Sequence, residues 1–437
     1  ILVDDVRYNT EPFFQDGPVA NVVDSVAAEG VAYVSAAGND GQNAYQDGFR
    51  DSGKQGVVSS GAVAHDFAPS GGAVDTLQRI TVRRGGTFRI FTLQWTDPSA
   101  LVDGSVGADT DLDVALVNDT LGIVAQSARD SDALGLPVEG VLDYTNLGAV
   151  DANQDGAADS TYHLVIEKAA GPSPDGVKYI HSGFNYEIEE HAPSGPTLYG
   201  HPMAEGALAV AAAPFFNTAA YNANVDPAVL EPFSSKGGIK VRFDETGIPI
   251  LAPEAREKPD LTATDGVDNT FFGTDSAYDT DTHPNFFGTS AAAPNAAAIA
   301  ALVWEANPGF TPTEVYDHLK SSAQDVTDRQ TRNGAFVSVP SGVDAWSGHG
   351  FMRATAAALP VTLADFGAVV EEKRAVLTWT TTRETNNAGF GIEHKRGDGT
   401  FETIGYEAGG GTTAESRTYR HRTAPLGPGL HTFRLRQ

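Results

Sequence analysis

The residue best placed to do chemistry is Ser290, in residues 288–294 (GTSAAAP), which open a long alanine-rich segment. The composition predicts a helix over residues 290–306 that ends at Asn307-Pro308-Gly309. A serine at a helix start has unpaired backbone N–H groups and the positive end of the helix dipole beside it. This environment favours the negative charge that forms when a serine attacks a carbonyl. Ser290 is therefore a candidate nucleophile, and the alternative is an ordinary helix N-cap serine.

A second candidate, Asn39, follows a buried strand predicted over residues 31–36. Residues 1–6 predict another strand, and the apolar residues between them recur with helical spacing. Two strands joined by one helix should be parallel. Functional groups in such sheets lie at the carboxyl ends of the strands, which is where Asn39 falls. The alternative is a turn asparagine ahead of Asp40-Gly41.

These segments resemble the subtilisin-like serine peptidases, whose nucleophile lies in a Gly-Thr-Ser-Met/Ala-Ala-x-Pro segment that opens such a helix. Similar stretches follow the family's order: residues 31–39 (VAYVSAAGN), 200–213 and 258–261 (KPDL). The resemblance covers about residues 1–68 and 196–350. It implies an acyl-enzyme on Ser290, with the side-chain amide of Asn39 donating to the oxyanion. It also implies that the substrate-binding residues are Val6, Ala36, Ala37 and Gly38.

The acid and base that activate the nucleophile are not apparent in this sequence. Subtilisins run Asp, His, Ser along the chain, so the resemblance implies that both residues precede residue 1. His65, His201 and His283 all follow Asn39, and the latter two, each followed by Pro, are interpreted as loop histidines. The chain begins and ends in strand-like runs, so we expect it to be truncated at both ends. We expect residues 1–437 to be inactive alone.

The segment that should wall the substrate cleft departs from the subtilisin pattern. Residues 4–8 (DDVRY) and 11–17 (EPFFQDG) stand where a Ser-Leu-Gly stretch is usual. They resemble bacterial relatives grouped between the subtilisins and the sedolisins, which use Glu and Asp in place of His. The type of upstream base therefore stays open. Asp4 and Asp5 are either cleft residues that prefer basic side chains, or buried structural or metal-binding residues.

Composition limits the class of protein. The 437 residues, 41% hydrophobic, suggest two to four domains. The net charge of −28, spread along the chain, excludes nucleic acid and anionic lipid as natural partners. The lack of cysteine excludes disulfides, thiol catalysis and cysteine-ligated zinc. No run approaches the ~18–20 apolar residues that span a bilayer. A protein or peptide substrate is the expected partner, and the oligomeric state is left open.

The chain alternates between segments rich in buried Ala and Val and segments of short β-prone runs separated by turns. This predicts an α/β fold in which a subtilisin-like parallel-sheet core carries an inserted antiparallel β-sandwich and a C-terminal β-sandwich. Residues 1–68 are the first core segment, and residues 69–195 resemble the jelly-roll domains of secreted bacterial proteases. Residues 196–358 are the second core segment, with a helix predicted to begin at Thr311 in a capping box with Glu314. Residues 359–437 resemble a fibronectin-type sandwich.

One loop in the insert has the spacing of calcium ligands. Around Gly156, oxygen-bearing side chains alternate at Asp151, Asn153, Asp155 and Asp159. Tyr162 stands where an EF-type loop has its closing glutamate, so the alternative is a solvated acidic turn. A weaker second candidate comprises Asp275, Asp279 and Asp281. Calcium would be structural, and catalysis needs no cofactor.

The features together predict an extracellular or cell-surface bacterial serine endopeptidase. The resemblance implies the location as well as the reaction. The alternative is an inactive, protease-derived adhesion or binding protein, which the acidic surface and the two β-modules would also suit.

Overall fold

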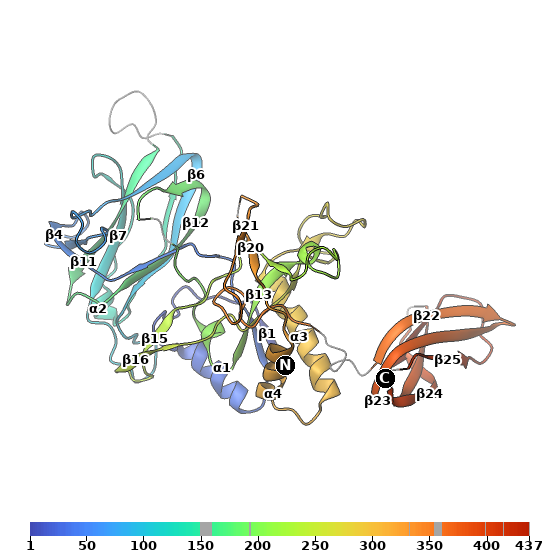
Figure 1. Cartoon of the computed structure of the whole chain (residues 1–437). Helices are drawn as coiled ribbons and strands as arrows, with labels where there is room; N and C mark the ends of the chain where they lie inside the picture. Colours follow the sequence, from blue (N-terminus) through green and yellow to red (C-terminus); the bar gives the residue numbers. More distant parts are fainter. Residues whose placement is uncertain are drawn as a thin grey trace. The chain divides into compact units, whose positions relative to one another are not determined.

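The computed structural model describes residues 1–148, 160–191, 194–331, 333–353, 361–397, 399–413 and 415–436 (Figure 1). The chain divides into two units, Ile1–Ala298 with Thr311–Met352, and Ile299–Phe310 with Arg353–Gln437. Within the described ranges, no helix combines the length and apolar character that crossing a membrane requires.

A four-stranded parallel sheet organises part of the first unit. Its strands, in spatial order, are β1 (Leu2–Asp4), β2 (Tyr33–Ala36), β13 (Ala207–Pro214) and β17 (Leu261–Asp265). β13 is buried along its whole length, as is typical of a parallel strand covered on both faces. Helix α1 (Pro18–Ala28) connects β1 to β2 and buries Ala20 and Val23. The predicted β-α-β unit is confirmed, although β1 is shorter than expected.

A larger antiparallel sheet of ten strands lies in the same unit (Figure 1). Its strands are β3 (Ala44–Asp47), β4 (Asp51–Gln55), β5 (Val63–His65), β6 (Gln78–Trp95), β7 (Asp111–Val117), β8 (Ile123–Ser127), β9 (Val138–Glu139), β10 (Leu142–Thr145), β11 (Thr161–Ala170) and β12 (Val177–Ile188). Large side chains such as Trp95, Tyr162 and Tyr179 fill its core. A short helix, α2 (Ser131–Leu134), lies between β8 and β9 in sequence.

The antiparallel sheet begins earlier in the chain than the expected insert. β3 pairs with β12 and β5 pairs with β11, so residues from 44 onward contribute strands to it, ahead of residue 69. The predicted domain limits stay predictions. The fold class is confirmed in part: the parallel sheet is present but small, and most of the described chain is β-structure. The two-layer sandwich arrangements stay predictions.

The elements between residues 201 and 338 that are not part of these sheets are short, apart from the two helices α3 and α4. They are η1 (His201–Met203), η2 (Phe215–Asn217), β14 (Val229–Leu230), β15 (Lys240–Phe243), β16 (Pro249–Ala255), β18 (Val267–Asp268), β19 (Asn285–Phe286), α3 (Thr289–Ala306), α4 (Pro312–Ser322), β20 (Asp328–Gln330) and β21 (Phe336–Ser338). The capping box of Thr311 and Glu314 at the start of α4 is confirmed.

The second unit contains one antiparallel sheet of five strands. They are β22 (Val361–Glu371), β23 (Arg374–Arg396), β24 (Glu402–Thr413), β25 (Arg417–Arg422) and β26 (His431–Arg436). Alternate residues of the long strand β23, including Leu377, Trp379, Phe390 and Ile392, form its buried core. The fibronectin-type likeness stays a prediction.

Candidate active site

Ser290 lies in the first turn of α3, and this turn is held by the ends of two parallel strands. The Asp265 carboxylate, at the end of β17, accepts a 2.7 Å hydrogen bond from the Gly288 N–H. Asn39 Oδ1 accepts hydrogen bonds from the N–H and the hydroxyl of Thr289, both at 3.0 Å. The Gly38 N–H donates to the Thr289 hydroxyl at 3.0 Å. The backbone around the candidate nucleophile is therefore fixed from both sides.

The side-chain nitrogen of Asn39 and the backbone nitrogen of Ser290 both lie near one point beside Gly288. Gly288 has a φ of +129°, and a Cβ added there would lie 3.4 Å from Asn39 Nδ2 and 3.6 Å from both Ser290 N and Ser290 Oγ. The amide of Asn39 and the N–H of Ser290 thus border a small space next to the hydroxyl oxygen. A carbonyl attacked by that oxygen would develop its negative charge near both donors. Glycine at position 288 leaves this space open.

Asp5 contacts Ser290 directly, which the sequence did not reveal. It follows the last residue of β1, and its Oδ1 accepts a 2.8 Å hydrogen bond from the Ser290 hydroxyl. Of the two roles expected for Asp5, the cleft role agrees with this position, because its side chain is exposed rather than buried. The signal available in the sequence was its position one residue before Val6, a predicted wall of the cleft.

None of the three histidines considered as bases has a recorded contact with Ser290 in the described part of the chain. His65 is buried in the antiparallel sheet, where it bonds to Tyr45, and burial lowers its pKa to about 4. His283 is exposed in a loop, as expected. The interpretation of His201 as a loop histidine is wrong: it begins η1 and is fully buried.

Two carboxylates surround the buried side chain of His201. Its Nε2 lies 2.9 Å from Asp4 Oδ2, and its Nδ1 lies 2.9 Å from Glu11 Oε2. Burial alone would lower the pKa of His201, but the hydrogen bonds and charges of Asp4 and Glu11 raise it to about 9. His201 is therefore a cation at neutral pH.

This arrangement predicts a pH-dependent contribution to stability. The pKa of His201 rises from about 6.5 in the unfolded chain to about 9 in the folded one, so its stabilisation is complete below pH 6.5 and is lost as the pH rises through 9. We expect the unfolding free energy of the wild type, relative to His201→Gln, to fall by about 2–3 kcal/mol between pH 6.5 and 9. Urea unfolding of both proteins at several pH values measures this. A difference that does not change with pH would contradict the pairing.

The predicted substrate-binding residues lie together in one pocket. Val6, Ala36, Ala37 and Gly38 line a cavity of about 250 Å³ next to Ser290 and Asn39. Asp5, Arg7 and Glu11, from the segments expected to wall the cleft, also line it. The sequence did not reveal the remaining lining residues: Asp40, Thr197, Tyr199, His201 and Pro202. An extended peptide lying over Ser290 would have a hollow in which to insert one side chain.

The predicted calcium ligands Asp151, Asn153, Asp155 and Asp159 lie outside the described residues. The second candidate does form a cluster: the carboxylates of Asp275, Asp279 and Asp281 lie within 4.8 Å of one another. Asp275 and Asp281 are exposed, and Asn285 donates to Asp279 at 2.8 Å.

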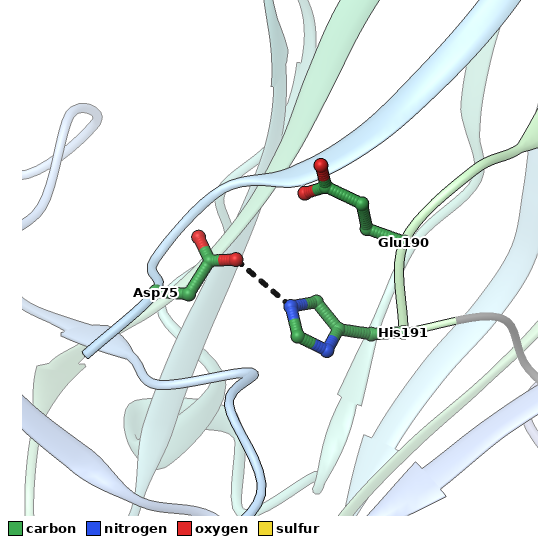
Figure 2. A group of neighbouring side chains, drawn as sticks. All are labelled: Asp75, Glu190 and His191. Carbon is green, nitrogen blue, oxygen red and sulfur yellow. Dashed lines mark hydrogen bonds and ion pairs between the residues drawn. The ribbon is translucent and has the colours of Figure 1, made fainter. Parts of the chain in front are cut away.

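Another cluster, shown in Figure 2, contains Asp75, Glu190 and His191. Asp75 Oδ2 lies 2.9 Å from His191 Nε2, so imidazole and carboxylate pair with each other. The guanidinium of Arg79 pairs with Glu190. Because Arg79 already supplies a positive charge, we assign no metal ion to this cluster.

A third cluster in the antiparallel sheet has the donor chemistry that calcium prefers. Asp111, Asp113 and Glu139 are all buried, and their oxygens lie within 4.8 Å of one another. Burial raises the pKa of each group, and neighbouring carboxylates raise it further for Asp111 and for Asp113, whose pKa reaches about 7. They take part in none of the ion pairs found among the described residues. An all-oxygen set that lacks a cationic side chain suits Ca²⁺.

Comparison with known proteins gives one family match. The model of the subtilase family (Peptidase S8) matches residues 9–350. Among solved structures, the Aeromonas sobria serine protease in complex with the chaperone ORF2 is 12% identical, with a TM-score of 0.28, over 100% of this chain and 68% of that chain. A Paenibacillus cycloisomaltooligosaccharide glucanotransferase with bound cycloisomaltoheptaose is 9% identical, with a TM-score of 0.15, over 99% of this chain and 51% of that chain. No curated protein matches.

Proposed function

Because the chain belongs to the subtilase family of serine peptidases, we propose that it carries the nucleophile and oxyanion site of a secreted serine endopeptidase. The observation that supports this best is the convergence of Asn39 Nδ2 and Ser290 N beside Ser290 Oγ. Two N–H donors next to a nucleophilic oxygen are what acyl transfer requires.

The proposed reaction has two steps. Ser290 Oγ attacks the peptide carbonyl carbon, its proton passes to a base, and the amine leaves with a proton. Water then attacks the resulting ester, and the peptide acid and the free serine are released. Asn39 and the Ser290 N–H would stabilise the oxyanion in both steps.

We further propose that residues 1–437 alone do not turn over substrate. Among the described residues, the Ser290 hydroxyl donates to Asp5, and none of the three candidate histidines contacts it. The base, whether a histidine or a carboxylate, and its partner acid would precede residue 1, in keeping with the order of a subtilisin triad.

A fluorophosphonate probe tests the function on the native protein purified from its source. We expect one adduct per chain, on the tryptic peptide that contains Ser290, and hydrolysis of casein by the same preparation. Absence of an adduct at Ser290 would favour the inactive binding protein instead. Casein hydrolysis by isolated residues 1–437 would contradict the second proposal.

We also propose that the chain binds a structural calcium ion through Asp111, Asp113 and Glu139. Calcium at 100 times its Kd would stabilise the folded state by about 2.7 kcal/mol, which corresponds to several degrees in Tm. We therefore expect EDTA to lower the Tm of the wild type, and calcium rather than magnesium to restore it. Asp113→Asn should remove the calcium response, whereas Asp275→Asn, in the exposed cluster, should keep it. An identical Tm with EDTA and with calcium would contradict the proposal.

A further inference from the structure

The pocket beside Ser290 contains more negative than positive groups. The carboxylates of Asp5, Glu11 and Asp40 line it, against the cations of Arg7 and His201. How these charges pair determines which side chain the pocket can accept.

Glu11 supplies a carboxylate at the buried side of the pocket. Gly200 has a φ of +74°, and a Cβ added there would lie 2.4 Å from Glu11 Oε2, so glycine leaves room for the carboxylate. Glu11 Oε1 accepts a 3.0 Å hydrogen bond from the backbone N–H of His201. Because Asp4 also pairs with His201, two carboxylates share one imidazolium. The cluster of Asp4, Glu11 and His201 therefore carries a net negative charge.

The other cation of the pocket is already paired. The Arg7 guanidinium forms an ion pair with Asp40 and lies over the ring of Phe91, 5.0 Å from its centroid. Unlike Asp40, Asp5 takes part in none of the ion pairs found in the described ranges. Its carboxylate accepts a hydrogen bond from the Ser290 hydroxyl. Asp5 and the Asp4–His201–Glu11 cluster therefore give the pocket a net negative charge.

Tyr199 points independently to a ligand. Its side chain lines the pocket and is 3% exposed, yet its hydroxyl has no hydrogen-bond partner among the described residues. Burial raises the pKa of Tyr199, so the hydroxyl stays neutral. A buried hydroxyl without a hydrogen-bond partner destabilises the protein, and a ligand whose N–H groups donate to it would remove this cost.

We propose that this pocket binds the side chain of arginine or lysine on the residue whose carbonyl Ser290 attacks. The inference rests on the proposed function for the identity of the attacked bond. A guanidinium or ammonium group offers N–H donors to the Tyr199 hydroxyl and positive charge to Asp5 and Glu11. An acidic side chain would meet the same carboxylates and be repelled.

Ligand binding to residues 1–437 tests the specificity without requiring turnover. The probe is 4-aminobenzamidine, and the matched neutral control is 4-aminobenzamide, which has the same shape without the charge. We expect the cation to bind with a Kd of about 1 mM or below and about tenfold tighter than the amide. Equal affinity, tighter binding of the amide, or no binding of either would overturn the proposal.

Variants identify the side chains that are responsible for the preference for a cation. Tyr199→Phe and Asp5→Asn conserve volume, and each should weaken binding of 4-aminobenzamidine about threefold to tenfold. Only Asp5→Asn, which removes a charge, should have little effect on the neutral amide, because the amide also offers N–H donors to the Tyr199 hydroxyl. Glu11→Gln should weaken it further, provided that its circular dichroism matches the wild type. Asp275→Asn, far along the chain in the exposed cluster, serves as the control for net charge. Unchanged affinity in both Tyr199→Phe and Asp5→Asn would overturn the assignment. Failure of the fluorophosphonate reaction would instead count against the proposed function.

Discussion

Replacing Ser290 by alanine is expected to abolish both fluorophosphonate labelling and casein hydrolysis by the native protein. The hydroxyl lies beside two N–H donors, on a turn whose backbone bonds to Asp265 and Asn39, and alanine at this position removes the attacking oxygen. In a subtilisin, loss of the nucleophile costs about 10⁶-fold in kcat. Intact-protein mass spectrometry and a casein assay measure the two losses.

Ser321→Ala is the matched control for this experiment. Ser321 is an exposed serine on helix α4, and its hydroxyl donates to a backbone carbonyl of the same helix. The variant should be labelled and should hydrolyse casein as the wild type does. Labelling that persists in Ser290→Ala would mean that another serine is the nucleophile, and the proposed site would be wrong.

Local sequence patterns were sufficient to predict the helix of Ser290 and the strand before Asn39. Both rest on short-range features: a stretch of small residues followed by a helix stop, and a buried run that ends in Gly-Asn. The capping box at Thr311 was predictable for the same reason, because its two partners are three residues apart. The long-range contacts of these elements could not be predicted from the sequence.

The partners of the site come from far along the chain, and this is why the sequence missed them. Asp5 and Ser290 are 285 positions apart, and Glu11 and His201 are 190 apart. No periodicity connects such residues, because the parallel sheet brings them together only after folding. The error about His201 has this origin: His-Pro is typical of a loop, whereas burial between Asp4 and Glu11 depends on two distant carboxylates.

The start of the antiparallel sheet was missed for a related reason. β3, β4 and β5 are short, and β3 contains Asp while β4 contains Asp, Gly and Lys, which are depleted in strands. β3 exists because it pairs with β12, more than a hundred residues later in the chain. Strand assignment there depends on a long-range partner that a local pattern does not contain.

Replacing Asn39 by alanine is the second large effect that we expect. The side-chain amide borders the space in which the oxyanion would form, and Asn39 Oδ1 also receives the N–H and hydroxyl of Thr289. Removing the matching donor of a subtilisin lowers kcat by about 10²–10³-fold. We expect a loss of this size in kcat for the native protein, with KM little changed, because the donor acts mainly on the transition state.

Asn39→Asp separates stabilisation of the oxyanion from positioning of the turn. Aspartate keeps an oxygen that can accept from Thr289, so the turn that carries Ser290 should stay in place. It loses the N–H donor and adds a negative charge next to the oxyanion. If the donor is what matters, Asn39→Asp should lose at least as much kcat as Asn39→Ala while its Tm stays nearer the wild type. If Asn39 only positions Thr289, Asn39→Asp should retain most of the activity. That result would contradict the assignment of Asn39 as an oxyanion donor.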